Sequence, residues 1–490
     1  MANEYIIGLD VGTQSTRVII FDRDGAMVSK GARKHQPHMI NKPGWAEHPM
    51  GDLWNAFLGA CHDALEQFPG ALSEIKAFGL STQRCCRAYV NRKGELIHPM
   101  MSWLDIRSLD YHQPGPMYED AYKLLTNSGY YCYQLTGQFK DTTANLTGCY
   151  YPFSQQTGAW IEDPAEFAKH NIRPDQLPEL VRPGEIMGHI TAQAALETGL
   201  PEGLPVVAGA GDKQVEVLGA GAMNAGQAYI TCGTYCGLLL VGGEYLEDPS
   251  MGCYLAAHPG KYHYEGYGVR RGFWTVSWFA RQFGCVAQKL MESRDISCEA
   301  ALDIMAEQVP MGCEGLMLIP DFVPPTSDKA YRRGSILGFD GRHTAAHMYR
   351  AVLEGIALSL KANIDWMIGN IRKDIEEIRI GGGGSNSTIG MQIFADVFGV
   401  PVVRTTNPES CALGAAIDAA VGCGMYPGFE EAVSGMVHIR DRFEPYSSSH
   451  KFYSELLERV YNEIRPATDG VYQKSQQFWE TWSAKESELL

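Results

Sequence analysis

The chain has 490 residues, of which 45% are hydrophobic, so it is long enough to bury a large core and to form two or three domains. Its 57 acidic residues outnumber its 41 basic residues, which gives a formal net charge of −16. No stretch is rich enough in Lys and Arg to track a phosphate backbone, which argues against nucleic acid as a partner.

The N-terminus and the apolar segments argue against secretion and membrane insertion. Residues 1–4 lead directly into the apolar segment Tyr5 to Leu9, without the basic start and the cleavage site of a secretory signal. No apolar run approaches the roughly 20 residues that a membrane span needs. We therefore expect a soluble, cytoplasmic protein with no membrane partner.

The thirteen cysteines are predicted to be reduced thiols. Most stand singly in apolar stretches, which suits small hydrophobic side chains in a core. Cys85-Cys86 and the pair Cys232 and Cys236 have no second pair or nearby histidine to complete a zinc site. We therefore expect a structural role for them and no disulfides.

The first predicted element is a β-hairpin with a polar tip. Two apolar runs, Tyr5 to Leu9 and Val18 to Phe21, flank the polar segment Asp10 to Arg17. A similar layout returns from Ala228 to Leu240, around Gly233-Thr234. This echo predicts two similar α/β domains that each offer a Gly-Thr hairpin tip to a shared cleft. The alternative is coincidence, because Gly-Thr pairs are common.

The duplication divides the chain into two predicted domains, residues 1–222 and residues 223–490. Apolar periodicity predicts the later elements. They are a strand at 206–208, a helix at 349–364, a strand at 375–380, a glycine turn at 381–384, a helix at 388–398 and a strand at 400–403. The small side chains of residues 411–416 would let a helix pack closely against its neighbours or against a nucleotide.

The polar tip of the first hairpin could serve phosphoryl transfer, which needs metal-bound phosphates and donors around the transferring group. Asp10 ends the first strand and could hold Mg²⁺ through water. Gly12, Thr13 and Arg17 could donate hydrogen bonds to phosphate oxygens. Equally, Asp10 and Thr13 could do no more than stabilise a turn.

Asp212 is the candidate catalytic base. It follows Gly209-Ala210-Gly211 directly after an apolar strand, so the backbone lets its carboxylate come close to a ligand. Such a carboxylate could accept the proton of a substrate hydroxyl while the oxygen attacks the γ-phosphorus of ATP. The alternative is a turn residue or a helix cap.

The glycine run Gly381 to Gly384 opens a predicted helix and exposes amide N–H groups to a nucleotide. The spacing of Gly382, Gly384 and Ser387 imperfectly imitates the dinucleotide-binding GxGxxG, but no acidic residue ends the following strand. An NAD-dependent oxidoreductase is therefore a second hypothesis. The Walker, metalloprotease, hydrolase and protein-kinase signatures are absent from the sequence.

Taken in order, these segments resemble the FGGY carbohydrate kinases, a family that includes glycerol kinase, xylulokinase and the autoinducer-2 kinases. The matching motifs are Asp10 to Arg17, Gly44 to Pro49, Trp103 to Arg107, Gly209 to Asp212, Leu218 to Gly221, Gly233-Thr234, Gly334 to Glu354 and Gly381 to Ala416. Each motif is weak alone, but their combined length and order are specific. The resemblance implies an α/β fold of two ribonuclease-H-like (actin-like ATPase) domains around a central cleft.

The resemblance also implies roles for individual residues, with ATP and Mg²⁺ as cofactors. The implied set is Thr13, Arg17, Gly233 and Thr234 for phosphates; Gly382, Gly383 and Asn386 for adenosine; Asp10 and Asp212 for the magnesium neighbourhood. Arg84 and Trp103 are the candidates for substrate contact, together with the catalytic Asp212. The alternatives are a solvated loop side chain for Arg84 and a buried core aromatic for Trp103.

Three features depart from the family pattern. The interval between Arg107 and Tyr133 is short, so we expect part of the usual substrate wall to be missing or rebuilt. Lys213 stands where glycerol kinases carry a glutamine, and Cys85 where they carry glutamate and xylulokinases carry histidine. These differences argue against glycerol and xylulose as substrates.

The sequence therefore predicts a kinase that transfers the γ-phosphate of Mg·ATP to a hydroxyl of a small sugar or polyol. A catalytically silent nucleotide- or sugar-binding regulator is the alternative, because the segment after Arg107 is short. Dimers occur in the family, so a homodimer is one expected assembly, although no residue marks an interface.

Overall fold

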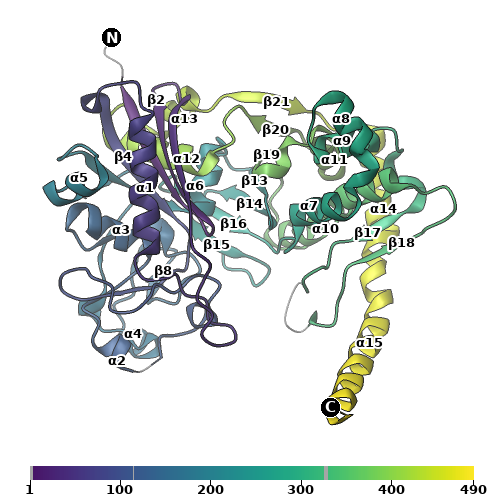
Figure 1. The fold of residues 1–490 in the computed structure, drawn as a ribbon, viewed down its shortest axis with the longest axis horizontal. Coiled ribbons are helices and arrows are strands. Elements are labelled where there is room, and N and C mark those ends of the chain that lie inside the picture. The colour runs from purple at the N-terminus through teal and green to yellow at the C-terminus, as the bar shows by residue number, and fades with distance from the viewer. Residues whose placement is uncertain (1–3, 114, 325–328, 490) are drawn as a thin grey trace.

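The computed structural model describes residues 4–113, 115–324 and 329–489. Two large mixed sheets lie in the two halves of the molecule (Figure 1). In spatial order, the strands of the N-terminal sheet are β11 Ile186–His189, β12 Pro205–Gly211, β4 Ile75–Thr82, β1 Tyr5–Val11, β2 Ser15–Asp22 and β3 Met27–Lys34. Those of the C-terminal sheet are β15 Gly252–Leu255, β16 Tyr262–Glu265, β14 Cys236–Gly242, β13 Gln227–Cys232, β19 Glu377–Gly381, β20 Val402–Thr405 and β21 Ile439–Phe443.

The two sheets repeat the same pattern of strand directions. β1 pairs antiparallel with β2 and parallel with β4, and β13 pairs in the same way with β14 and β19. Beyond them, β4 and β19 each have a parallel neighbour, β12 and β20, followed by an antiparallel strand, β11 and β21. The duplication predicted from the two hairpins is therefore confirmed by the sheet topology.

The helices and the minor strands surround these sheets. In the first half the helices are α1 Asp52–Glu66, α2 Pro116–Glu119, α3 Asn127–Thr136, α4 Pro164–His170, α5 Ala192–Thr198 and α6 Asp212–Gly219. In the second half they are α7 Gly272–Phe283, α8 Gln288–Arg294, α9 Cys298–Ala306, α10 Ala345–Ile371, α11 Thr388–Phe398, α12 Ser410–Gly422, α13 Phe429–Met436, α14 Ser447–Leu456 and α15 Asn462–Leu489. The minor pairs are β5 Ala88–Val90 with β6 Lys123–Leu125, β7 Lys140–Thr142 with β10 Glu179–Val181, β8 Phe153–Ser154 with β9 Ala159–Trp160, and β17 Met317–Ile319 with β18 Ser335–Leu337.

Most of the predicted elements are found close to their expected bounds. The helix expected at 388–398 is α11, and the helix expected at 349–364 forms the middle of the longer α10. The strands expected at 375–380 and 400–403 are β19 and β20, each displaced by one or two residues. Such displacement is usual, because apolar periodicity locates a strand better than its ends.

Helix α12 comes from the C-terminal half of the chain but packs on the N-terminal sheet. Its buried Ala412 and Ala416 share one hydrophobic cluster with Ile6 of β1. A Cβ atom on Gly414 would lie 2.0 Å from the Val215 carbonyl oxygen, so glycine is required where α12 approaches α6. The small residues of 411–416 therefore serve close packing between helices and strands. The domain boundary after residue 222 stays a prediction, since α12 joins the two halves.

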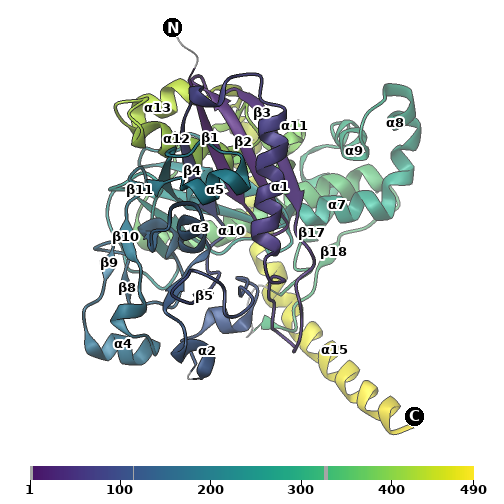
Figure 2. The ribbon, with the colours of Figure 1, turned by 60° about the vertical axis from the view of Figure 1, so that its left-hand side comes forward.

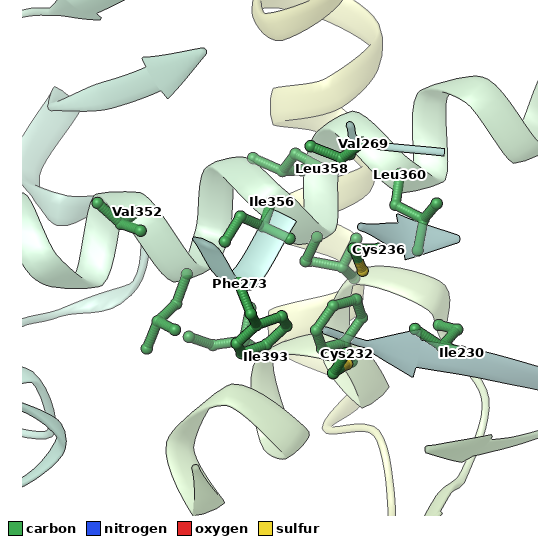
Figure 3. Close-up of a cluster of buried hydrophobic side chains, with 14 of the residues drawn as sticks. Ile230, Cys232, Cys236, Val269, Phe273, Val352, Ile356, Leu358, Leu360 and Ile393 are labelled. Carbon is green, nitrogen blue, oxygen red and sulfur yellow. The ribbon is translucent and has the colours of Figure 1, made fainter. Parts of the chain in front are cut away.

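The core of the C-terminal half lies between its sheet and the long helix α10. Ile230 and Cys232 of β13 belong to one hydrophobic cluster with Phe273 of α7, Ile356 of α10 and Ile393 of α11 (Figure 3). Each such apolar side chain contributes about 1.5–3 kcal/mol on burial. This packing fixes the sheet that carries the second hairpin.

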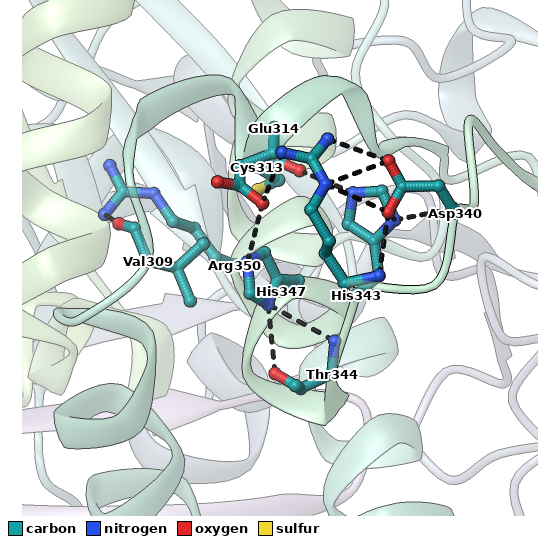
Figure 4. A network of polar contacts seen from close by, with 9 residues as sticks. Val309, Cys313, Glu314, Asp340, His343, Thr344, His347 and Arg350 are labelled. Carbon is teal, nitrogen blue, oxygen red and sulfur yellow. Dashed lines mark hydrogen bonds and ion pairs between the residues drawn. The ribbon is translucent and has the colours of Figure 1, made fainter.

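The motif from Gly334 to Glu354 forms a polar network at the start of α10. Figure 4 shows His343 joining Asp340 to the Cys313 carbonyl: the Asp340 amide donates to Nδ1 at 2.8 Å, and Nε2 lies 3.1 Å from the oxygen. Arg350 Nε donates to the buried Glu354 at 2.8 Å, and its Nη1 donates to the Val309 carbonyl at 2.8 Å. These contacts are structural and tie α10 to the preceding loop.

Two further features concern the whole chain. The thirteen cysteines, all among the described residues, are free thiols, as predicted. Helix α15 extends away from the body to the C-terminus in both views (Figures 1 and 2). None of the helices in the described ranges is long and apolar enough to cross a membrane.

Candidate active site

The predicted site residues lie where parallel strands of both sheets end. β1, β4 and β12 are parallel, and Asp10, Arg84 and Asp212 stand at or just beyond their carboxyl ends. In the other sheet β13 and β19 are parallel neighbours, and Gly233-Thr234 and Gly382 follow them. The carboxyl ends of parallel strands are the usual place for ligands in α/β folds.

Asp10 is buried and accepts hydrogen bonds from two side chains. Arg17 Nη1 donates to its Oδ2 at 2.7 Å, and the Cys411 thiol donates to its Oδ1 at 3.2 Å. Burial raises the pKa of Asp10, the Arg17 charge opposes this rise, and the Asp212 carboxylate adds to it. The two carboxylates at 10 and 212 are therefore close enough to interact.

Asp212 is the first residue of α6, immediately after β12. Its carboxylate is partly exposed, and its Oδ1 accepts a hydrogen bond from the Lys213 amide at 2.9 Å. The start of a helix favours a negative charge. The Lys213 amine lies 2.9 Å from the Glu216 carboxylate, so its charge is balanced within the helix.

Arg84 binds the opposite half of the molecule and is not the solvated loop side chain of the alternative interpretation. Its Nη1 and Nη2 donate to the two carboxylate oxygens of Glu265 at 2.9 and 3.3 Å. Its guanidinium also lies 5.8 Å from the centre of the Tyr254 ring. A Cβ atom on Gly211 would lie 2.5 Å from Arg84 Cγ, so the arginine stem packs against the residue before Asp212.

Trp103 lies beside the tip of the first hairpin. Its indole Nε1 donates to Thr13 Oγ1 at 2.9 Å, and the side chain is 43% exposed. The alternative interpretation of a buried core aromatic is therefore wrong. The Thr13 hydroxyl accepts the indole hydrogen bond through one of its lone pairs, so it can still donate its own proton to a ligand.

The residues predicted to bind nucleotide are exposed at two adjacent loops. Thr231 of β13 pairs with Gly381 of β19, so the loops that follow the two strands begin side by side. Thr234, Gly382, Gly383 and Asn386 are exposed. Gly382 adopts φ 86°, which favours glycine.

A buried arginine anchors the second of these loops. Arg404 Nη1 donates to the carbonyl oxygens of Ser385 and Asn386 at 2.7 and 3.3 Å. Its Nε donates to Asp441 at 2.8 Å. Strand β20 thereby fixes the backbone on which Asn386 is presented.

Tyr235 connects the second hairpin with the Arg84 region. Burial and the Glu265 carboxylate raise the pKa of Tyr235, while the Arg84 charge lowers it, so the phenol is near both side chains. The structure thus brings Asp10, Arg17, Asp212 and Arg84 together, and it places Trp103 on Thr13.

Sequence reasoning missed several side chains of the site. Glu265 ends strand β16, far along the chain from Arg84, and no local pattern identifies it as a partner. His48 is buried against Gln83, with their Nε2 atoms 3.1 Å apart, and burial lowers the pKa of His48 to about 3. The motif Gly44 to Pro49, which contains His48, could have indicated this contact.

The donor set is compatible with magnesium bound together with a nucleotide. Within the described ranges, no group of three or more His, Cys, Asp or Glu side chains could hold a metal ion by itself. Mg²⁺ usually takes one or two carboxylates and fills its shell with water and phosphate oxygens. The neighbouring carboxylates of Asp10 and Asp212 fit that requirement.

Two family models together match most of the chain, from residue 5 to residue 423. The N-terminal domain of the FGGY family of carbohydrate kinases matches residues 5–114 and 109–219. The C-terminal domain of the same family matches residues 228–423.

Curated relatives are similar over the same length. The uncharacterized sugar kinase YgcE of Escherichia coli (strain K12) is 40% identical over 477 residues, which covers 97% of this chain and 96% of the relative. A glycerol kinase of Deinococcus radiodurans is 28% identical, with 95% and 98% covered. The autoinducer-2 kinase of Photorhabdus laumondii is 27% identical, with 100% and 96% covered.

Solved structures share the fold. A gluconate kinase from Lactobacillus acidophilus superposes with a TM-score of 0.81 at 23% identity, covering 96% of this chain and 100% of the other. The Plasmodium falciparum glycerol kinase with ADP gives a TM-score of 0.77 at 20% identity, with 94% and 98% covered. The actin-like ATPase fold expected from the sequence is therefore confirmed. The comparisons give no support to the NAD-dependent enzyme or the silent regulator.

Proposed function

Because the chain belongs to the FGGY family of carbohydrate kinases, it is an ATP-dependent sugar kinase, and we propose that Asp212 is its catalytic base. The acceptor is a hydroxyl of a small sugar or polyol. The observation that carries this proposal is the position of Asp212 at the start of α6, where it interacts with the Asp10 carboxylate and with Arg84.

The proposed chemistry is general-base catalysis of phosphoryl transfer. The Asp212 carboxylate accepts the proton of the sugar hydroxyl as that oxygen attacks the γ-phosphorus, which works near neutral pH because the two events are coupled. Asp10 and Asp212 would hold Mg²⁺, which neutralises phosphate charge when it is bound. Thr13, Arg17, Gly233 and the exposed Thr234 would donate to phosphate oxygens.

The adenosine part would lie on the loop after β19. Gly382 and Gly383 are exposed and allow close approach of a ligand to the backbone. Arg404 holds the carbonyl of Asn386, which leaves the Asn386 side chain exposed for polar contact. Arg404 of strand β20 therefore holds the backbone of the loop that we expect to bind adenosine.

The charges around Arg84 favour a neutral substrate. Glu265 already occupies both terminal nitrogens of the Arg84 guanidinium, so the arginine has no unbalanced charge to offer a carboxylate. Trp103 is half exposed beside the same region and offers an aromatic face to the carbons of a sugar ring. We therefore expect neutral sugars and polyols as substrates in preference to sugar acids.

A coupled ADP-release assay tests the proposal. Purified protein is incubated with Mg·ATP and a panel of neutral polyols, neutral ketoses and aldonic acids. The proposal expects sugar-dependent ADP release with at least one neutral member and a lower kcat/KM for its acid analogue. A preference for the acids would contradict the assignment of a charge-balanced Arg84.

The cellular compartment and the assembly of the protein can be proposed from its cysteines and its family. Thirteen free thiols suit a reducing compartment, so we propose the cytoplasm. A homodimer stays a prediction that size-exclusion chromatography with light scattering would test.

A further inference from the structure

We propose that Cys85 and Cys149 form an oxidisable thiol pair next to Arg84, and that a peroxide converts the pair into a disulfide that weakens sugar binding. The effect on sugar binding rests on the proposed function. Formation of the disulfide does not, and it can be measured without any substrate.

The two thiols are held together by a shared acceptor. Cys85 Sγ donates to the Thr147 carbonyl at 3.3 Å, and Cys149 Sγ contacts the same oxygen at 3.6 Å. The two thiols also interact, since each shifts the pKa of the other. Gly148 lies between Thr147 and Cys149 in the chain, and a Cβ atom on it would be 3.7 Å from Cys85 Sγ. The turn at 147–149 therefore wraps around the Cys85 sulfur.

Cys85 has the surroundings of a reactive thiol. The nearby Cys149 thiol lowers the pKa of Cys85, burial opposes this, and the charges of Arg84 and Arg87 lower it further. Its φ of 58° is left-handed, a conformation that costs free energy for a residue with a side chain. Both Cys85 and Cys149 are partly exposed, whereas Cys86 is buried and its pKa is raised by that burial.

The reaction needs only a peroxide as oxidant. The Cys85 thiolate attacks one peroxide oxygen, the O–O bond breaks, and the other oxygen leaves and takes up a proton to form water. Cys85 is then a sulfenic acid. The Cys149 sulfur attacks the Cys85 sulfur, the S–O bond breaks, and the departing hydroxide takes the Cys149 proton to form a second water. Two thiols are oxidised by two electrons, and the peroxide is reduced to two molecules of water.

The disulfide would disturb the predicted sugar contact. A disulfide holds its sulfurs about 2.05 Å apart, closer than the sulfurs of two free thiols, so residues 85 and 149 must move toward each other. Arg84 precedes Cys85 and is fixed at its other end by Glu265 of the opposite sheet. A shift of the backbone at residue 85 therefore displaces Arg84 from both Glu265 and the stretch before Asp212.

The test uses the full-length protein with hydrogen peroxide and a matched set of variants. The proposal expects peptide mapping to find a Cys85–Cys149 disulfide, with the loss of two hydrogen atoms, and dithiothreitol to reverse it. In Cys149→Ser the oxidation should stop at a Cys85 sulfenic acid that dimedone traps. In Cys85→Ser, Cys149 should stay reduced. Cys285→Ser, which removes an exposed thiol elsewhere, should behave as wild type.

The same oxidised and reduced samples are used to measure KM for the sugar and for ATP. The oxidised protein should show a rise in KM for the sugar of roughly tenfold or more, with a smaller change in KM for ATP, and dithiothreitol should restore both. The proposal is overturned if peroxide oxidises Cys285 while Cys85 and Cys149 stay reduced. A disulfide that forms without changing KM for the sugar would overturn the effect on binding.

Discussion

Arg84 and Glu265 form a two-pronged ion pair that joins the two sheets, with N–O distances of 2.9 and 3.3 Å. Arg84 follows β4 of the N-terminal sheet, whereas Glu265 ends β16 of the C-terminal sheet. Paired guanidinium and carboxylate groups of this geometry are the strong form of the interaction.

The first prediction concerns this pair. Glu265→Gln removes the charge that balances Arg84, so the ratio of kcat/KM for a sugar acid to that for its neutral analogue should rise by about tenfold, or about 1.4 kcal/mol. The measurement is ADP release with both compounds. Glu179→Gln, which changes an exposed carboxylate, serves as the control and should leave the ratio unchanged. An unchanged ratio in Glu265→Gln would contradict the charge-balance argument.

The second prediction concerns the bond between Trp103 and Thr13. Trp103→Phe keeps the ring but removes the indole donor, and Thr13→Val removes the acceptor. Each change should lower kcat/KM, and the double variant should lose less than the sum of the two, by roughly 0.5–1.5 kcal/mol. Additive losses would mean that the bond has no part in catalysis.

The third prediction concerns the contact between α6 and α12. A Cβ atom on Gly414 would lie 2.0 Å from the backbone oxygen of Val215, so Gly414→Ala must push the two helices apart. The free energy of unfolding should fall by roughly 1–3 kcal/mol. Gly369→Ala on α10 is the control, because no heavy atom lies within 4 Å of the new Cβ and alanine favours the helix. Equal stability of the two variants in urea titration would refute the prediction.

The fourth prediction concerns the buried Asp418 of α12. Neither of its carboxylate oxygens has a hydrogen-bond partner among the described residues, and burial raises its pKa well above 3.8. Because the folded state then holds a proton that the unfolded state releases, this group costs stability as the pH rises above about 4, by up to about 1.4 kcal/mol per pH unit.

Asp418→Asn removes that titration. Relative to wild type, the variant should gain stability as the pH rises above about 4, as read from melting temperatures. Parallel melting curves for the two proteins would show that Asp418 holds no more protons in the folded state than in the unfolded state, which would contradict a raised pKa.

The fold could be predicted from local patterns to a large extent. The apolar runs around Asp10 to Arg17 and around Gly233-Thr234 predicted both hairpins, and the two sheets repeat the same topology. The side of the molecule on which α12 packs could not be predicted. Small residues such as those of 411–416 predict that a helix packs closely, but they do not indicate which sheet or helix it packs against.

The site could be predicted only in part. Asp10, Arg84 and Asp212 stand at strand ends, and the structure brings them together. The partners that set their charges, Glu265 and Cys411, come from distant segments that only the tertiary fold brings near. Local periodicity has no information about such contacts.

The most direct test of the account is the Asp212→Asn variant. The amide keeps the shape of the side chain but cannot accept the hydroxyl proton, so kcat should fall by roughly 10²–10⁴-fold. The affinity for Mg·ATP should stay within about threefold of wild type, because the residues expected to hold the phosphates and adenosine are unchanged. Asp175→Asn, at an exposed position, should match wild type. Wild-type turnover by Asp212→Asn would contradict the assignment of Asp212 as the base.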